Sequence, residues 1–191
     1  MLEVPVDYLP HYLAPAEAST LLDALDQTLD WQQEYLRMYG KSIPFPRLMA
    51  WYGNAGASYT FSRKTYQPQE PTAELQALMH RLNQDFGQGF NSVLANAYRT
   101  GADSMAWHSD DEPELGPQPF IASISLGQTR VFKLRHRQTR EVHAWDLEHG
   151  SLMIMRNECQ SDWEHCVPKS KKAQNLRINL TFRQILPAKL P

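Results

Sequence analysis

Residues 120–155 read FIASISLGQTRVFKLRHRQTREVHAWDLEHGSLMIM and hold four short apolar or alternating runs, separated by turn-forming residues. Similar runs stand on either side, SVLANAY at 92–98 and LRINLTF at 176–182. Short runs of this kind with turns between them are typical of strands in an antiparallel sandwich, barrel or jelly roll. The sequence therefore predicts a mainly β fold from about residue 92 onward.

Two segments before this region have helical periodicity. The first begins at Pro15 and has leucines at positions 21, 22, 25 and 29. The second begins after Pro71 and Thr72 and ends at Gly87. Residues 31–67, rich in aromatics, Gly and Pro, are expected to form short strands and loops. We therefore expect an α+β domain with the two helices on the outside of one sheet.

The overall composition excludes several classes of protein. With 42% hydrophobic and 21% charged residues in 191, the chain fits one globular domain rather than a disordered or fibrous segment. No apolar run approaches the roughly 20 residues that span a membrane, and the N-terminus lacks the features of a signal peptide. We expect a monomer that is not secreted, cytoplasmic in a bacterium or nuclear in a eukaryote. Cys159 and Cys166 are expected to be free thiols.

The net charge of −2 argues against a protein that is basic all over, but leaves room for local basic patches. The first patch comprises Arg130, Lys133, Arg135, Arg137 and Arg140, and the second comprises Lys169, Lys171 and Lys172. Each patch taken alone is more typical of a solvated surface than of a phosphate contact. Both lie close in sequence to the residues described next, which makes a nucleic-acid partner a hypothesis to test.

His108 and Asp110, in WHSDDE, are two residues apart, so both side chains project to one side of an extended segment. A third ligand must come from elsewhere, and His165 lies in another strand-like segment, DWEHCVP. Two imidazoles and one carboxylate form the facial triad of non-haem iron(II) oxygenases, which leaves positions for a cosubstrate and oxygen. Spacing alone does not select His165, because the chain has seven histidines.

The segment RINLTFR at 177–183 supports this chemistry. On a strand its polar residues share one face and its apolar residues the other. Two arginines facing the inside of a barrel are costly unless an anion is bound there, and guanidinium holds carboxylates by paired hydrogen bonds. The alternative is an edge strand with its arginines in solvent. The polar face comprises Arg177, Asn179, Thr181 and Arg183, and Asn96 and Tyr98 share a face of another expected strand.

These segments together resemble the AlkB family of nucleic-acid dealkylating dioxygenases, in particular members similar to the mammalian homologues 2 and 3. The resemblance runs in order over about residues 44–185, and its joint pattern of NxY, HxD, a distant His and RxNxTxR is highly specific. It implies one dioxygenase domain over 1–191, with N-terminal helices, a nucleotide-recognition lid at about 35–67 and a double-stranded β-helix (jelly-roll) core at about 92–185. It also implies Fe(II), 2-oxoglutarate and O2.

The resemblance further implies a role for each matching residue. Iron would be held by His108, Asp110 and His165, and the distal carboxylate of 2-oxoglutarate by Arg177. The rest of the cosubstrate site would comprise Asn96, Tyr98, Thr181 and Arg183, and the flipped base would meet Tyr59, Phe61, Ser62 and Glu112. Tyr39 falls where homologue 2 has an apolar finger, and Lys169, Lys171 and Lys172 fall where it has a basic loop that touches the DNA backbone.

The reaction implied by the resemblance is oxidative demethylation of bases such as 1-methyladenine and 3-methylcytosine, giving formaldehyde, succinate and CO2. The substrate would be alkylated DNA, single- or double-stranded, with RNA as an alternative. Because the alkyl group lies on the pairing edge, the base must be flipped or unpaired. Three rivals stay open: an oxygenase of this fold that acts on a protein or small molecule, a non-catalytic β-barrel module, and a zinc hydrolase with the same three ligands.

Overall fold

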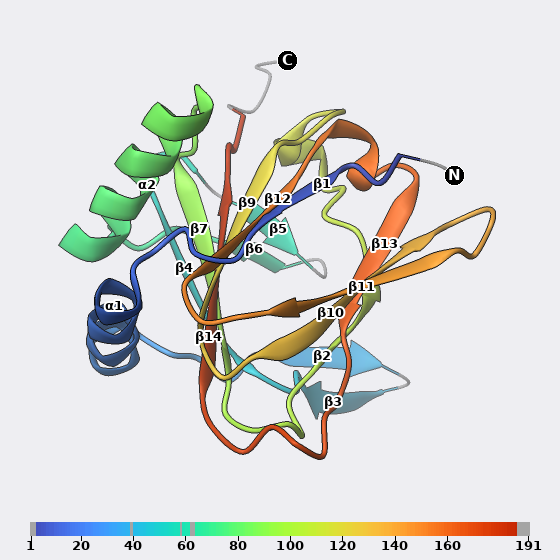
Figure 1. The fold of residues 1–191 in the computed structure, drawn as a ribbon, viewed down its shortest axis with the longest axis horizontal. Coiled ribbons are helices and arrows are strands. Elements are labelled where there is room, and N and C mark those ends of the chain that lie inside the picture. Colours follow the sequence, from blue (N-terminus) through green and yellow to red (C-terminus); the bar gives the residue numbers. More distant parts are fainter. Residues whose placement is uncertain (1–2, 39, 58, 62–63, 187–191) are drawn as a thin grey trace.

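The computed structural model describes residues 3–38, 40–57, 59–61 and 64–186, and two antiparallel sheets dominate it (Figure 1). The larger sheet has six strands, in the order β1 (Val6–Leu9), β12 (Ser151–Met155), β9 (Ile121–Gly127), β14 (Arg177–Arg183), β7 (Ser92–Tyr98) and β4 (Leu48–Gly53). The smaller has four, in the order β11 (Val142–Leu147), β10 (Arg130–His136), β13 (Trp163–Val167) and β8 (Met105–His108). The predicted mainly β jelly-roll architecture is confirmed.

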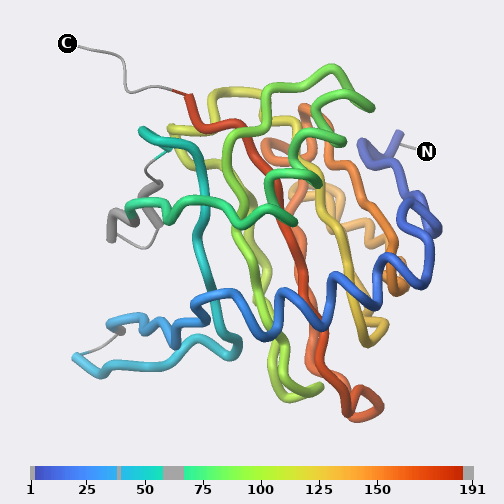
Figure 2. The backbone as a smooth tube through the Cα atoms, turned by 90° about the vertical axis from the view of Figure 1, so that its left-hand side faces the viewer, coloured from blue at the N-terminus to red at the C-terminus, as the bar shows by residue number. Residues whose placement is uncertain are grey.

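Short elements lie between the strands of these two sheets in the chain. Two hairpins occupy the region expected to hold short strands, β2 (Tyr35–Met38) with β3 (Lys41–Pro44), and β5 (Tyr59–Phe61) with β6 (Lys64–Tyr66). Two 3-10 turns follow later, Pro113–Leu115 and Asn157–Cys159. The β2–β3 hairpin projects from the body of the molecule (Figure 2).

Both predicted helices are present and cover the outer face of the larger sheet (Figures 1 and 2). α1 (Pro15–Thr28) begins with proline, whose missing N–H costs nothing in the first turn. α2 (Ala73–Phe86) is capped by the Thr72 hydroxyl, which accepts a hydrogen bond from the Leu75 N–H, and ends at Gly87 with a φ of 62°. The helices and the outer face of the sheet share one hydrophobic core.

The central position of β14 determines where the functional site lies. The strand lies between β9 and β7, so the alternative of an edge strand in solvent is wrong. Its apolar residues, Ile178, Leu180 and Phe182, belong to the core beneath the helices. The polar residues of the strand therefore face the space between the two sheets, as predicted, and every residue of the strand is buried. Cys159 and Cys166 are free and buried, again as predicted.

The connection from β13 to β14, which carries Lys169, Lys171 and Lys172, is attached to the body through Gly101. Its N–H donates to the Ala173 carbonyl (2.9 Å), and its carbonyl accepts from the Ser170 N–H (2.8 Å). A Cβ at this position would overlap the Ser170 carbonyl oxygen.

Among the helices in the described residues, none has the length and the apolar composition of a membrane-spanning segment.

Gly101→Ala is therefore expected to lower the free energy of unfolding by about 1–3 kcal/mol, as overpacking does in a site where only backbone could yield. Thermal or urea unfolding measures it. Gly89→Ala is the matched control, because its Cβ would meet only the flexible end of the Gln184 side chain. Equal stability of the two variants would contradict the close packing of this connection.

Candidate metal and cosubstrate site

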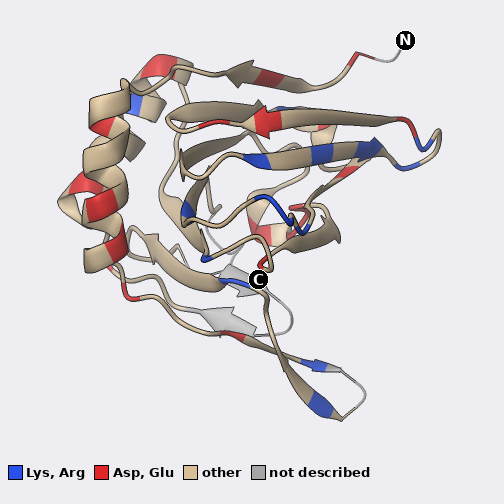
Figure 3. Cartoon of the chain, turned by 60° about the horizontal axis from the view of Figure 1, so that its bottom comes forward, with Lys and Arg blue, Asp and Glu red and all other residues tan. Residues whose placement is uncertain are grey.

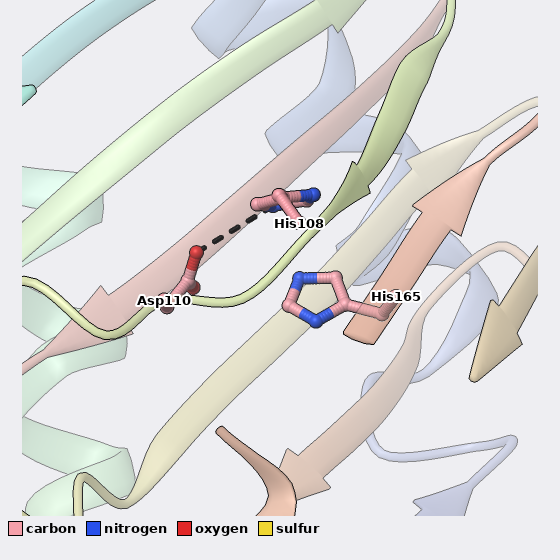
Figure 4. Close-up of side chains that lie close together, drawn as sticks. All are labelled: His108, Asp110 and His165. Atoms are coloured by element: carbon pink, nitrogen blue, oxygen red, sulfur yellow. Dashed lines mark ion pairs between the residues drawn. The ribbon is translucent and has the colours of Figure 1, made fainter. Parts of the chain in front are cut away.

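The structure brings the three predicted metal ligands together (Figure 4). His108 is the last residue of β8, and His165 lies directly opposite it on the neighbouring strand β13. Asp110 follows in the loop after β8. One ligating atom from each residue lies within 4.8 Å of the others, and the two imidazole ring centroids are 4.2 Å apart. The pairing of β8 with β13 thus supplies the third ligand that sequence spacing alone did not select.

Both imidazoles are held in the neutral form that binds metal. Burial, followed by repulsion from His108, lowers the pKa of His165 to about 3. Its Nδ1 is buried with no hydrogen-bond partner among the described residues, and Phe132 stacks on the ring at 5.4 Å between centroids. Burial also lowers the pKa of His108. Its Nδ1 lies 2.9 Å from the Ala106 carbonyl oxygen, so Nδ1–H donates there and Nε2 is left with its lone pair.

Asp110 supplies the negative charge of the site. Burial opposes ionisation of its carboxyl group, but Arg183 and the two histidines outweigh that effect and hold the pKa well below its usual range. Arg183 Nη2 donates to Asp110 Oδ2 at 2.6 Å, while Oδ1 lies 3.5 Å from Nε2 of His108. One carboxylate oxygen is thus held by Arg183, and the other faces the imidazoles.

The loop that carries Asp110 is fixed through groups that the sequence analysis missed. Gln160 is buried, and its Oε1 accepts a hydrogen bond from the Asp110 N–H at 2.9 Å. Its Nε2 lies 3.6 Å from Met155 Sδ. The Ser109 hydroxyl donates to the Trp163 carbonyl at 2.8 Å. Nothing in the sequence around Gln160 distinguishes it from an ordinary loop glutamine, since the contact depends on the tertiary fold.

Gln160→Leu is expected to weaken metal binding by about 10- to 100-fold, the usual effect of losing a group that orients a ligand. The variant leaves the buried Asp110 N–H without its acceptor. Calorimetric titration with Fe(II) under anaerobic conditions measures the change. Gln174→Leu, on the exposed β13–β14 connection, is the control. Unchanged affinity in Gln160→Leu would show that this residue does not position Asp110.

The polar face of β14 continues the site away from the metal ligands. Arg177 is 1% exposed, and its Nη2 donates to Ser125 Oγ at 2.9 Å. Its Nε and Nη1 are buried with no hydrogen-bond partner among the described residues. A buried guanidinium with two unused donors is unfavourable unless an anion completes it. Charged N–H groups bind carboxylates strongly, so this guanidinium, which also lies over the Tyr98 ring, fits a cosubstrate with a carboxylate at its far end.

One cavity contains both halves of the site. Its lining includes every predicted ligand of the metal and of the cosubstrate: His108, Asp110, His165, Asn96, Tyr98, Arg177, Thr181 and Arg183. Several of these side chains bond to protein groups. The Thr181 hydroxyl donates to Asn179 Oδ1 at 3.1 Å, and Arg183 bonds to Asp110 rather than pointing to solvent. The residues that would hold a divalent cation and those that would hold a dicarboxylate thus line one cavity.

Two buried arginines have structural contacts that the sequence did not reveal. Arg47 is 1% exposed, and its Nε donates to Asn96 Oδ1 at 2.8 Å. Arg130, which the sequence analysis placed in a basic surface patch, is 2% exposed, so its place in that patch is wrong. Its guanidinium donates to the carbonyl oxygens of Thr100, Asp103 and Pro168.

The structure describes only some of the residues predicted to contact the substrate. Tyr39 and Ser62 lie outside the described residues, as do the side chains of Tyr59 and Phe61. Glu112 is half-buried in the loop after Asp110. In the β13–β14 connection all three lysines, Lys169, Lys171 and Lys172, are exposed. These roles stay predictions.

Comparison with known proteins agrees with this geometry. The chain matches the 2OG-Fe(II) oxygenase superfamily over residues 5–183. It is 40% identical to the rat protein "Alpha-ketoglutarate-dependent dioxygenase alkB homolog 3" over 188 residues, which are 93% of this chain and 63% of the relative. It is 39% identical to the mouse protein "DNA oxidative demethylase ALKBH2" over 185 residues, which are 91% of this chain and 77% of the relative.

The human alkB homolog 3 is also 40% identical, over 93% of this chain and 65% of the relative. The chain thus spans just under two thirds of the length of the homolog 3 proteins it matches. Among solved structures, that of OsALKBH1 matches with a TM-score of 0.64 at 20% identity, over 96% of this chain and 100% of the other. That likeness supports the fold.

Proposed function

Because this chain belongs to the AlkB family of the 2OG-Fe(II) oxygenase superfamily, we propose that it removes alkyl groups oxidatively from nitrogen atoms of nucleic-acid bases. The observation that carries the proposal is that the triad, with Asp110 and His165 buried, lines one cavity with Arg177, which has two nitrogens without a hydrogen-bond partner among the described residues. The 1-methyladenine and 3-methylcytosine type of lesion, in DNA, is the proposed substrate, and repair of alkylated DNA is the proposed role.

Fe(II), 2-oxoglutarate and O2 would supply the oxidising chemistry, and the residues of this chain supply geometry and exclusion of water. His108, Asp110 and His165 would hold the metal, and Arg177 would bind the distal carboxylate. Arg183 keeps Asp110 charged and fixes its orientation. Apolar residues such as Phe132 and Met155 line the cavity beside these polar groups.

The substrate class is supported by chemistry close to the site. The proposed lesions carry a positive charge, and Glu112, half-buried and two residues beyond Asp110, would favour a cationic base. Alkylation of the pairing edge abolishes normal pairing, which lowers the cost of taking the base out of a stack. Two relatives carry names that describe alkB-type dioxygenase or DNA demethylase activity.

A substrate panel tests the proposal. One N-methylated base is placed in single-stranded DNA, duplex DNA and RNA, and is given to the protein with Fe(II), 2-oxoglutarate and air. Formaldehyde and the unmodified base are the expected products. Succinate production that no oligonucleotide stimulates, with no formaldehyde, would instead favour the rival oxygenase acting on a protein or small molecule.

The finger role proposed for Tyr39 has its own test. Tyr39 falls between the strands of the projecting β2–β3 hairpin and outside the described residues. Tyr39→Ala is expected to reduce repair of duplex DNA more than repair of single strands, because only a duplex leaves a gap to fill. Equal losses on the two substrates would argue against this role.

A further inference from the structure

A groove of about 500 Å³ lies beside the metal cavity and shares His108 with it. It is formed by the β2–β3 hairpin, the residues that follow the hairpin, β8 and the end of β13. Leu36 and Ile43, which pair across the hairpin, both line the groove. Ile43 is 41% exposed, so this apolar wall is open to solvent. The groove is lined by His108, but by no other residue assigned above to the metal or to 2-oxoglutarate.

The groove combines aromatic and apolar surface with positive charge. Trp107 and Phe45 contribute rings, and the exposed Lys169 contributes a positive charge. Arg47 also lines the groove, but its side chain is buried and donates to Asn96. Among the described residues that line it, none is Asp or Glu. The hairpin strands carry Arg37 and Lys41 and no acidic residue, and Figure 3 shows basic residues on both arms of the projecting hairpin. Stacking surface with a basic border is what single-stranded nucleic acid needs.

Trp107 is held in place for stacking. The Arg135 guanidinium carbon lies 4.0 Å from the centroid of the ring, in a cation–π contact. Arg135 is in turn fixed by Glu164, with Nη2 at 2.6 Å and Nε at 2.8 Å from Oε1. The indole is therefore oriented before any ligand arrives, which lowers the entropic cost of stacking on it.

Trp107 is also next to a metal ligand. His108 lines both the metal cavity and the groove, whereas Trp107 lines the groove and not the metal cavity. A base presented to the metal at His108 would thus have its neighbour in the strand close to Trp107. In a duplex, the base next to the alkylated one is already stacked and paired. In a single strand, that base can stack on Trp107 instead.

We propose that this groove binds an unpaired nucleobase adjacent to the alkylated one, stacked on Trp107, with its phosphate near Lys169. The inference rests on the proposed function and adds to it a preference for substrates that are unpaired beside the lesion. An apolar protein segment is a weaker occupant, because it would offer no negative charge to the exposed Lys169, whereas a phosphate does.

Binding of an undamaged single-stranded oligonucleotide tests the proposal without catalysis. Trp107→Leu is expected to weaken this binding by about 5- to 150-fold, the range for loss of one base–aromatic stack. Trp107→Phe should recover most of the affinity, since it keeps a ring. Tyr35→Leu is the control, because Tyr35 is on the same hairpin, 57% exposed, and does not line the groove. Fluorescence anisotropy of a labelled oligonucleotide provides the readout.

A second experiment needs no variant. An abasic nucleotide is placed next to the methylated base, on one side or the other, and KM and kcat are measured with the unaltered protein. An abasic position on one side removes the base that would stack on Trp107. It is therefore expected to raise KM by about 5- to 150-fold, as in Trp107→Leu, with little change in kcat. Binding that is the same in Trp107→Leu and Tyr35→Leu, or KM that neither abasic position changes, would overturn the proposal. If the unaltered protein demethylates no oligonucleotide, the proposed function fails instead, whatever the binding assay shows.

Discussion

His165→Ala is expected to abolish detectable Fe(II) binding and, with it, turnover. The variant removes one of three ligands from a buried site, so the loss should exceed the roughly 10- to 100-fold effect of losing a group that only orients a ligand. The remaining pair, His108 and Asp110, would form an incomplete site. Anaerobic calorimetric titration with Fe(II) measures the affinity.

The fold should survive this change, because the His165 side chain makes ring contacts but its Nδ1 has no hydrogen-bond partner among the described residues. His80→Ala, at an exposed position of α2, is the control for loss of a histidine and should bind Fe(II) normally. Fe(II) affinity in His165→Ala equal to that of His80→Ala would remove His165 from the metal site.

Arg177→Met is expected to raise the Kd for 2-oxoglutarate by about 100-fold or more. A hydrogen bond to a charged group contributes about 1.5–3 kcal/mol, and Arg177 offers two buried donors with no other described partner. Each 1.4 kcal/mol of binding free energy changes Kd tenfold. Losing two such hydrogen bonds should therefore raise the Kd for 2-oxoglutarate by at least about 100-fold. Binding of Fe(II) alone should change little, because Arg177 does not contact Asp110.

Two further variants separate charge from geometry. Arg177→Lys keeps the charge but not the paired donors, so it should recover only part of the affinity. Arg183→Lys should instead impair metal binding first, because Arg183 holds Asp110 Oδ2. If Arg177→Met binds 2-oxoglutarate as the unaltered protein does, the dicarboxylate lies elsewhere.

The features of the site that sequence predicts are those that depend on local periodicity. The alternation along β14 separates its arginines from its apolar residues, and the structure buries both faces as that pattern requires. The same reasoning places His108 and Asp110 on one side. The helices were equally predictable, since Pro15, Thr72 and Gly87 mark their ends.

The remaining features depend on contacts between distant segments. His165 is selected by its register opposite His108, which no spacing encodes. Gln160 and Arg47 bond to Asp110 and Asn96, which are 50 and 49 residues away in the chain. The prediction for Arg130 was wrong in the opposite direction: its charge suggested a surface residue, but it lies in the interior and donates to three backbone carbonyls.

The central claim is that the triad and the polar face of β14 form a single site for Fe(II) and 2-oxoglutarate. Anaerobic calorimetric titration of 2-oxoglutarate into Fe(II)-loaded and metal-free protein tests it most directly. We predict one equivalent bound, with clearly higher affinity when Fe(II) is present, since the metal and Arg177 line the same cavity. The same affinity with and without Fe(II) would contradict the claim.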